Sequence, residues 1–186
     1  MHTLTTTRLT LRQWLPEDLE PFAALNADPT VMEFMPALLS REQSARFIEG
    51  AAADLDRRGF GLWAVEERAS DAFVGCVGFS VPSFQAPFMP CVEILWRLAA
   101  PCWGRGFATE AARACLELGF GALDLEEVVS FTVPRNTRSR AVMERLGMRR
   151  DAHGDFAHPR LPPEHPLSHH VLYRLARTAW RRAENL

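Results

Sequence analysis

The sequence predicts a mixed α/β fold, organised as a single domain over residues 1–186. The length suits one domain of ordinary size, and 47% hydrophobic with 24% charged residues is the composition of a globular protein. Segments that alternate like strands and segments with helical periodicity follow one another in the order β-α-α-β-β-β-α-β-α-β, without a linker or an internal repeat.

The first third of the chain predicts a strand and two helices. Residues 7–14 alternate with a period of two, which indicates a strand. Pro16 opens a helix whose first turn carries acidic residues, and these suit the positive end of the helix dipole. After a break at residues 26–36, Ser40 begins a second helix with capping-box spacing, and this helix runs to about Arg58.

The middle of the chain predicts three strands, at residues 61–65, 73–79 and 91–98. The polar residues 66–71 join the first two strands as a hairpin. A looser loop, at residues 82–90, leads to the third strand.

A glycine turn, Gly104-Arg105-Gly106, joins the third of these strands to a helix and has the features of an anion site. Unpaired N–H groups and the helix dipole favour an anion at a helix start, and glycines permit close approach of the backbone. A tight turn without a ligand is the alternative interpretation. The helix has one face of small residues, which can lie close to a sheet: Ala108, Ala111, Ala112, Cys115 and Gly119.

A dinucleotide-binding turn is a second alternative for this unit. Thr109 stands where such a turn carries its last glycine or alanine, although Glu126 and Glu127 lie about where a ribose-binding acid is expected. Four predicted strands precede the turn and few follow it, whereas a dinucleotide turn usually closes the first strand of its domain. The order of the elements therefore disfavours a dinucleotide site.

The C-terminal part predicts two more strands around a short helix. Residues 128–133 are rich in β-branched residues, and Asn136 caps a helix that stops at Gly147. A loop rich in proline and histidine, residues 153–168, separates this helix from a last strand at residues 169–175. A helical tail then runs to the end of the chain.

The composition excludes several classes of protein. All 21 basic residues are arginine, which removes phosphate-binding loops with a lysine and chemistry that needs a Schiff-base lysine. The formal net charge of −2 gives no support for nucleic acid as a partner. No apolar run has the length of a membrane span, and the N-terminus lacks the apolar core of a signal peptide, so we expect a cytoplasmic protein without membrane contact.

Three segments resemble one known family, the GNAT acetyltransferases. Residues 92–98 and 101–111 read VEILWRL and PCWGRGFATEA, which is similar to the family's coenzyme A-binding core. The turn matches W-G-x-G-[YF]-A-T-E-A, the pattern of the branch that contains the ribosomal-protein N-terminal acetyltransferases. Residues 136–148 resemble the same branch's N-x-x-S-x-x-V-[ML]-E-[KR]-L-G-F motif, and residues 6–12 resemble its opening T-x-R-L-x-L-R.

The resemblance implies a GNAT fold, with a central mixed, largely antiparallel twisted sheet flanked by helices. It also implies an N-acetyltransferase that uses acetyl-CoA as co-substrate, needs no metal and acetylates a primary amine by direct attack. The acceptor amine is a small molecule or a protein N-terminus, and a homodimer is a further expectation. The alternative is a coenzyme A-binding module of the same fold without transfer activity.

The resemblance also assigns the site residues. Glu93 lies in an apolar strand that can raise its pKa towards neutrality, and we expect it to be the general base rather than an ion-paired surface residue. Ser139 is the expected proton donor to the departing thiolate, because Met143 stands where many relatives carry a tyrosine with that role. Asn136 is expected to hydrogen-bond the pantetheine arm as well as to cap its helix. The other expected coenzyme-binding residues are Trp96, Arg97, Leu98, Trp103, Gly104, Arg105, Gly106, Phe107, Ala108 and Thr109.

For two further features of the sequence we expect neither disulfides nor a metal site. The cysteines lie far apart in apolar runs, which favours buried free thiols: Cys76, Cys91, Cys102 and Cys115. The C-terminal histidines show no familiar metal-ligand spacing, so we interpret them as solvated loop residues or as a wall of the acceptor pocket: His153, His158, His165, His169 and His170. The loops at residues 26–36 and 153–168 are expected to select the acceptor.

Overall fold

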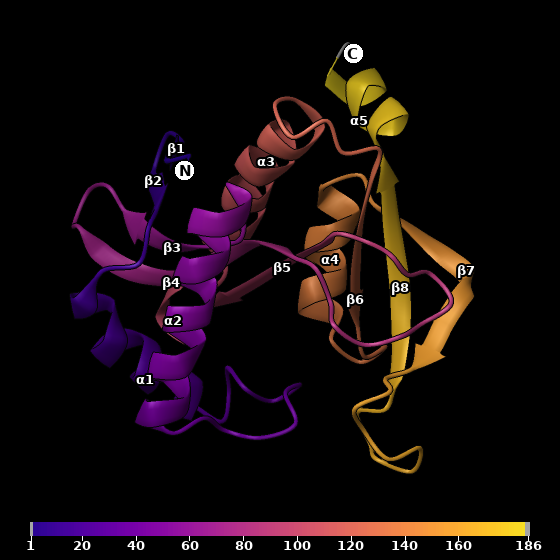
Figure 1. Ribbon diagram of the computed structural model, residues 1–186, viewed down its shortest axis with the longest axis horizontal. Helices are drawn as coiled ribbons and strands as arrows, with labels where there is room; N and C mark the ends of the chain where they lie inside the picture. Colours follow the sequence, from indigo (N-terminus) through magenta and orange to yellow (C-terminus); the bar gives the residue numbers. More distant parts are fainter. Residues whose placement is uncertain (1, 185–186) are drawn as a thin grey trace. The chain divides into compact units, whose positions relative to one another are not determined.

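The computed structural model describes residues 2–184, and residues 181–184 by their backbone alone. Its strands and helices follow one another as Figure 1 shows. In chain order they are β1 (Leu4–Thr5), β2 (Leu9–Arg12), a 3₁₀ turn (Pro16–Asp18), α1 (Leu19–Ala27), α2 (Arg41–Arg58), β3 (Leu62–Glu67), β4 (Ala72–Ser80), β5 (Glu93–Leu98), a 3₁₀ turn (Ala100–Cys102), α3 (Phe107–Phe120), β6 (Glu127–Thr132), α4 (Thr137–Arg145), β7 (Arg149–Ala157), β8 (His169–Ala176) and α5 (Arg177–Glu184).

The predicted mixed α/β class is confirmed. Hydrogen bonding orders the strands β1-β2-β3-β4-β5-β6-β8-β7, and of the described pairings only β5–β6 is parallel. The chain divides into two compact units, and the single domain over residues 1–186 stays a prediction. The first unit comprises the chain up to Phe79 with Leu95–Cys115, and the second comprises Ser80–Ile94 with the chain from Leu116 onward.

The first unit is an antiparallel set of strands that helices cover. The predicted hairpin is present, since β3 pairs with β4 and Trp63 lies opposite Val77. α1 packs against α2, and α2 packs against β3. Trp63, Phe22 and Leu55 are completely buried, and this burial of large apolar side chains is the main stabilising contribution to the unit.

The second unit contains the start of β5 and three further strands. β6 pairs with β8 along its whole length, and β7 pairs with the other edge of β8. The parallel pair β5–β6 is registered at Glu93 and Val129, and the amide of Val129 donates to the carbonyl of Val92 at 2.9 Å. α4 packs against β6. These pairings set the position of Glu93 within the unit.

The predicted helix ends are confirmed by their hydrogen bonds. The amide of Gln43 donates to Ser40 Oγ at 3.2 Å, and Gln43 Oε1 accepts from the amide of Ser40 at 2.7 Å. Asn136 Oδ1 accepts from the amide of Ser139 at 3.2 Å, which is the predicted N-cap. Gly147 has the positive φ, 81°, that favours glycine after a helix.

Two strands of the structure have no counterpart in the prediction. β1 is short, and β7 occupies the start of the region expected to be a loop, so that residues 153–157 are extended. β7 is mostly exposed and polar, and its pairing with β8 shifts register between Asp151 and Phe156. A strand without a buried face shows no period of two in its hydrophobicity, which is why the sequence does not predict it.

The four cysteines are all free, and two of them are buried as predicted. Cys76 and Cys115 are buried, whereas Cys91 and Cys102 are half-buried, so the prediction of burial is wrong for the latter pair. Within residues 2–184, no group of three or more His, Cys, Asp or Glu side chains lies together in a way that could hold a metal ion. None of the described helices is both long and apolar enough to span a bilayer.

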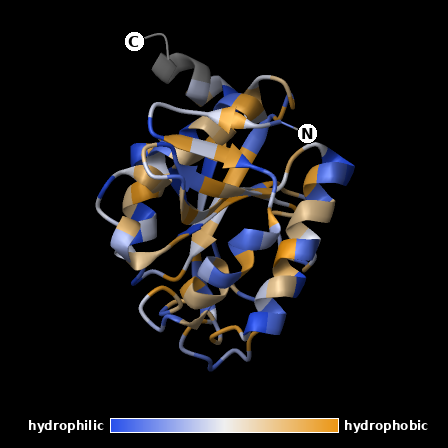
Figure 2. Cartoon of the chain, turned by 90° about the vertical axis from the view of Figure 1, so that its left-hand side faces the viewer, coloured by the Kyte–Doolittle hydropathy of each residue, from blue (hydrophilic) through white to orange (hydrophobic). Residues whose placement is uncertain are grey.

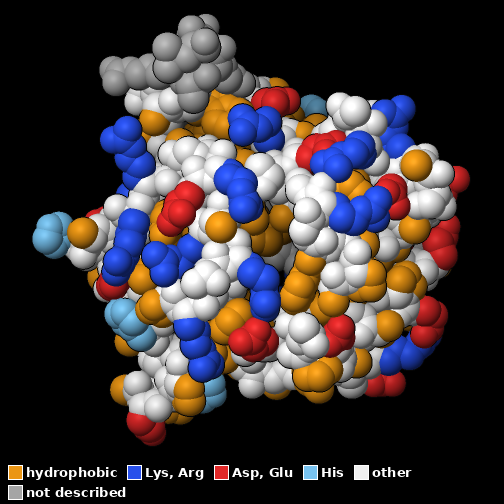
Figure 3. All heavy atoms as spheres, turned by 180° about the vertical axis from the view of Figure 1, so that it is seen from behind, with side chains coloured by type: hydrophobic (Ala, Val, Ile, Leu, Met, Phe, Trp, Pro, Cys, Tyr) orange, Lys and Arg blue, Asp and Glu red, His pale blue; other side chains and the backbone are white. Residues whose placement is uncertain are grey.

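The surface carries both signs of charge. Hydrophilic and hydrophobic residues alternate along the helices in Figure 2, as amphipathic helices require. In Figure 3 arginine and acidic side chains are interspersed over one face. Arg174, for example, pairs with Glu127 at 2.7 Å and with Asp151 at 2.8 Å. Exposed pairs of this kind are worth about 0–1 kcal/mol each, so they contribute little to the stability of the fold.

Candidate active site

The glycine turn at the start of α3 has the geometry of an anion site. Gly104 and Gly106 are exposed and have positive φ angles of 73° and 82°. No atom lies within 4 Å of the position that a Cβ on Gly104 would occupy, so a ligand can approach the backbone there. The amide of Glu110 makes the first helical bond, to the carbonyl of Gly106 at 3.0 Å, and helix geometry leaves the three amides before it without a helical acceptor.

Side chains of the first unit hold this turn in place. Trp103 Nε1 donates to the carbonyl of Leu98 at 2.9 Å, which ties the turn to the end of β5. Arg8 donates to Glu110 Oε2 at 2.7 Å through Nε and to the carbonyl of Arg105 at 2.9 Å through Nη1. The guanidinium groups of Arg8 and Arg105 both lie over the buried ring of Phe107, at 4.8 and 4.3 Å from its centroid. These contacts stabilise the conformation of the turn.

The end of β5 presents a backbone edge and an unusual arginine. Leu98 is buried, whereas Trp96 is half-buried. Arg97 Nη1 donates to Asn26 Oδ1 at 2.7 Å, and its guanidinium lies 5.5 Å from the ring centroid of Phe47. Burial lowers the pKa of Arg97. The coenzyme-binding role of these residues, and of Ala108 and Thr109 after the turn, stays a prediction.

Asn136 and Ser139 lie together at the start of α4 in the second unit. Asn136 accepts from the amide of Ser139 and donates through Nδ2 to Thr132 Oγ1 at 3.0 Å, so capping takes part of its hydrogen-bonding capacity. The Ser139 hydroxyl has no hydrogen-bond partner among the described residues and is open to a ligand. The two residues are placed as a cap and a free hydroxyl, which is compatible with both predicted roles.

The chain's one tyrosine is committed to structure. The hydroxyl of Tyr173 donates to Glu144 Oε1 at 3.0 Å and accepts from Arg140 Nε at 3.1 Å. Tyr173 is 2% exposed, and the position at which relatives carry a tyrosine is filled by the buried Met143. Ser139 therefore remains the candidate proton donor.

Glu93 is a buried carboxyl group at the first residue of β5. Its side chain is 9% exposed, and none of the described residues forms a hydrogen bond or an ion pair with it. Burial raises its pKa to about 8, because the charged form loses hydration and gains no partner. The sequence prediction that an apolar strand shifts this pKa towards neutrality is confirmed in direction.

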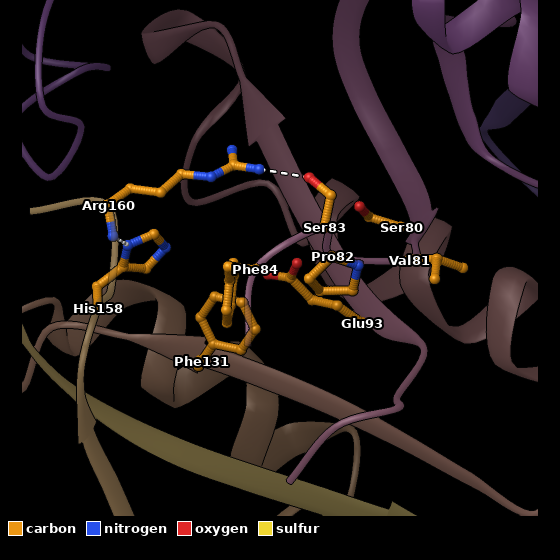
Figure 4. A pocket seen from close by; sticks show the side chains of 9 residues that line it. All are labelled: Ser80, Val81, Pro82, Ser83, Phe84, Glu93, Phe131, His158 and Arg160. Atoms are coloured by element: carbon orange, nitrogen blue, oxygen red, sulfur yellow. Dashed lines mark hydrogen bonds between the residues drawn. The ribbon is translucent and has the colours of Figure 1, made fainter. Parts of the chain in front are cut away.

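A cavity of about 240 Å³ in the second unit receives the Glu93 carboxyl group. The loop after β4 supplies one wall and the segment after β7 supplies another, as Figure 4 shows. The guanidinium of Arg160 donates to Ser83 Oγ across these two walls. The lining residues are Ser80, Val81, Pro82, Ser83, Phe84, Glu93, Phe131, His158 and Arg160.

Aromatic rings form the floor of this cavity. Phe84 lies 5.8 Å from Phe131 and 4.8 Å from His158, measured between ring centroids. Phe156 and His170 pack behind them, since the centroids of Phe131 and Phe156 are 5.4 Å apart and those of His158 and His170 are 5.2 Å apart. Burial is the largest cause that lowers the pKa values of His158 and His170, and it favours their neutral forms.

The sequence allowed two interpretations of the C-terminal histidines, as solvated loop residues or as a wall of the acceptor pocket, and the structure places histidines in both kinds of position. His158 lines the cavity, whereas His169 is exposed and lies 3.5 Å from Asp155. The sequence does not single out Arg160 or Phe131, and neither stands in a motif. The composition of the loop before β5, which contains proline, phenylalanine and glutamine, was the one weak indication for Phe84 in the sequence.

The family that matches this chain is a class of acyltransferases, and the solved structures with this mixed α/β fold include acetyltransferases. The chain belongs to the GNAT acetyltransferase family, because the family described as "Acetyltransferase (GNAT) domain" matches residues 8–149. YkkB of Bacillus subtilis (strain 168), an uncharacterized protein, is 32% identical over 146 residues, which cover 78% of this chain and 84% of YkkB. The uncharacterized N-acetyltransferase YnaD of the same organism is 29% identical over 152 residues, which cover 81% of this chain and 84% of YnaD.

Solved structures share the fold at lower identity. The structure of RimL, a ribosomal L7/L12 alpha-N-protein acetyltransferase in complex with coenzyme A, has a TM-score of 0.75 and 15% identity. The match covers 94% of this chain and 98% of that chain. The predicted resemblance to the family and to the fold of the ribosomal-protein acetyltransferases is confirmed.

Proposed function

We propose that this protein is an acetyl-CoA-dependent N-acetyltransferase that acetylates a primary amine by direct attack. The observation that carries the proposal is the Glu93 carboxyl group, buried, without a partner among the described residues and open to a cavity. An ammonium group cannot attack a thioester, so the reaction needs a base. A carboxyl group with a pKa of about 8 is partly ionised near neutral pH and suits that task.

The reaction assigns a proton transfer to each of two side chains. The amine nitrogen bonds to the carbonyl carbon of the thioester, the carbon–sulfur bond breaks and the sulfur leaves as a thiolate. Glu93 takes the proton that the amine loses. The Ser139 hydroxyl, directly or through water, gives a proton to the thiolate and regains one from solvent.

The glycine turn supports the coenzyme part of the proposal. A diphosphate group fits the exposed backbone of Gly104–Gly106 and the first amides of α3. The start of a helix offers N–H groups without a helical acceptor and a partial positive charge, and these two features favour an anion. The open space at Gly104 permits close approach of such a group. Asn136 retains one amide hydrogen and one lone pair for the pantetheine arm.

Binding of acetyl-CoA tests the proposal first. We expect saturable thermal stabilisation by acetyl-CoA, worth about 2.7 kcal/mol at 100 times Kd, and none by NAD. Thiol release with a panel of amines and peptides then tests transfer. Stabilisation by NAD alone would favour the dinucleotide alternative, and binding of acetyl-CoA without thiol release across the panel would favour the binding module.

Replacement of Gly104 or Gly106 by alanine should weaken coenzyme binding. An alanine at these positive φ angles costs about 1–2 kcal/mol of backbone strain, and at Gly104 the new methyl group fills the space left for the diphosphate. We expect Kd for acetyl-CoA, measured by calorimetry, to rise by about 10- to 100-fold in G104A.

Gly59 at the end of α2 provides a matched control for this prediction. It has a φ of 75°, and no atom lies within 4 Å of its added Cβ, so G59A carries the same strain in open space. G59A should lose similar stability and keep the wild-type Kd. Equal Kd values in G104A and G59A would show that the glycine turn is not part of the coenzyme site.

Replacement of Ser139 by alanine should slow the departure of the thiolate. We expect kcat to fall by about 10-fold, less than is usual for general acids, because water can replace the lost hydroxyl group. Kd for acetyl-CoA should not change, and S139T, which keeps a hydroxyl group, should recover much of kcat. An unchanged kcat in S139A would assign the proton to water alone.

Other expectations about this function stay predictions. Selection of the acceptor by the loop after α1, the cytoplasmic location and a homodimer belong to this group. The ribosomal substrate in the name of RimL is a property of that protein. The chemistry of the cavity points to a different acceptor.

A further inference from the structure

The cavity beside Glu93 contains one acidic and one basic side chain. Glu93 is the acid, and Arg160 is the only arginine among the residues that line the cavity. Many arginines of this chain pair with a carboxylate, as Arg150 does with Asp155 at 2.7 Å. Arg160 has no carboxylate partner among the described residues, so its charge is available to a ligand.

Arg160 is exposed and lacks a counter-charge, but one hydrogen bond orients its guanidinium. It donates to the hydroxyl group of Ser83, which lies 77 positions away in the sequence. The amide of Arg160 donates to His158 Nδ1 at 3.3 Å, which ties the backbone of Arg160 to the cavity wall. A positioned guanidinium retains several N–H donors and binds carboxylates with two parallel hydrogen bonds.

Apart from Glu93 and Arg160, the lining of the cavity carries no formal charge and is mixed in polarity. Phe84 and Phe131 present rings, Ser80 and Ser83 are polar, and burial lowers the pKa of His158, which favours its neutral form. The two rings can bind an aromatic or branched apolar group through its buried area. The volume of about 240 Å³ is below the roughly 300–1,000 Å³ of sites for drug-sized ligands, so the occupant is a small molecule.

We propose, building on the function proposed above, that the acceptor is a free amino acid with an aromatic or large apolar side chain. Its carboxylate binds Arg160, its amine faces Glu93 and its side chain lies against Phe84 and Phe131. One acid and one base in the cavity match the one ammonium and one carboxylate of such a molecule. In Figure 4 the guanidinium of Arg160 lies above the aromatic rings, and Glu93 lies beside them.

Two other acceptors match the cavity less well. A diamine or polyamine would bring a second positive charge next to Arg160, and the lining offers no second acid to pair with it. A peptide N-terminus has an amide where a free amino acid has its carboxylate, so Arg160 would lack its charged partner. The preference for a carboxylate next to the amine is therefore the property to measure.

The test compares three acceptors that differ in one group: L-phenylalanine, L-phenylalanine amide and 2-phenylethylamine. We expect kcat/KM, measured by thiol release, to be about 10- to 100-fold higher for phenylalanine than for the other two. R160Q should remove this preference, mainly by raising KM for phenylalanine, whereas R160K should keep part of it. R150Q is the matched control, because it removes an arginine of the same unit outside the cavity and should keep the preference.

Direct binding separates this proposal from the function on which it rests. Calorimetry should show that phenylalanine binds the wild type at least 10-fold more tightly than its amide does, and that R160Q binds both equally. Carboxylate-dependent binding without thiol release would overturn the transferase function and leave the ligand assignment standing. Transfer at equal rates to all three acceptors, or an equal loss for all three in R160Q, would overturn the amino acid assignment and leave the transferase standing.

Discussion

Replacement of Glu93 by glutamine should lower kcat/KM for acetyl transfer by about 10²- to 10⁴-fold near neutral pH, the range typical of a lost general base. Glutamine has nearly the same shape but cannot accept the amine's proton. Kd for acetyl-CoA should stay near the wild-type value, because the carboxyl group lines the cavity of the second unit and no residue of the glycine turn is among the lining residues. Steady-state rates and calorimetry on the same preparations measure both quantities.

The pH dependence identifies the group that is lost. Because burial raises the pKa of Glu93 to about 8, the carboxyl group is protonated at low pH and becomes a base only as pH rises. The wild-type kcat/KM should therefore rise through pH 8 and reach a plateau. E93Q should lose the part of this rise that is due to Glu93 and keep the part that is due to the amine of the acceptor.

A stability measurement tests the same pKa without any substrate. In the folded protein Glu93 keeps its proton up to about pH 8, whereas in the unfolded chain it ionises near its ordinary value of 4.5. Its contribution to stability is thus complete below the lower value and is lost as pH rises through about 8. Relative to E93Q, the free energy of unfolding of the wild type should fall over this window by an amount on the order of a few kcal/mol.

A surface glutamate of the same unit is the control for both measurements. Glu127 pairs with Arg174 and lies outside the cavity, so E127Q should keep the wild-type rate and pH profile. If E93Q retained the wild-type turnover at neutral pH, Glu93 would not be the base. A pH-independent difference in stability between E93Q and the wild type would show that the carboxyl group titrates normally.

Replacement of Asp18 by alanine should destabilise the fold by about 3–5 kcal/mol, the usual cost of breaking a buried ion pair. Asp18 is 2% exposed, and its two oxygens accept from Arg12 at 2.8 and 3.0 Å. It also accepts from the amide of Leu15 at 2.8 Å. Its loss would leave Arg12 with Glu66, at 2.8 Å, as its one carboxylate partner among the described residues, and would remove the acceptor of the Leu15 amide.

Glu20 is the matched control for Asp18. Glu20 lies only two positions after Asp18 and pairs with Arg41 at 2.6 Å, but the side chains of Glu20 and Arg41 are both more than half exposed. E20A should therefore change the free energy of unfolding by less than about 1 kcal/mol. Urea denaturation of D18A and E20A gives both values, and a difference below 1 kcal/mol between them would mean that the Arg12 network adds nothing beyond a surface pair.

Local features of the structure could be predicted because a few neighbouring residues determine them. The capping box at Ser40 and the N-cap at Asn136 each close a hydrogen bond three residues along the chain. The positive φ angles of Gly104 and Gly106 need only the absence of a side chain. Glu93 stood out because a glutamate within an apolar strand must be buried or paired.

The cavity could not be predicted, because its walls come from distant parts of the chain. Ser83 and Arg160 meet only when the loop after β4 and the segment after β7 fold against one another. β7 itself pairs through its backbone, which leaves no pattern in the side chains. The exposed loops around it show no period that would have placed Phe84 beside His158.

The order of the main elements, the caps of the helices, the glycine turn and the candidate base could all be predicted from the residues alone. Each of these depends on hydrogen bonds or backbone angles within a few residues, or on a motif of the family. The tertiary structure decided that Glu93 is buried without a partner among the described residues, and that Arg160 meets it at the same cavity. Burial and pairing depend on the path of the whole chain, and so the missing partner of Glu93 and the charge that Arg160 offers to a ligand became visible only in the folded protein.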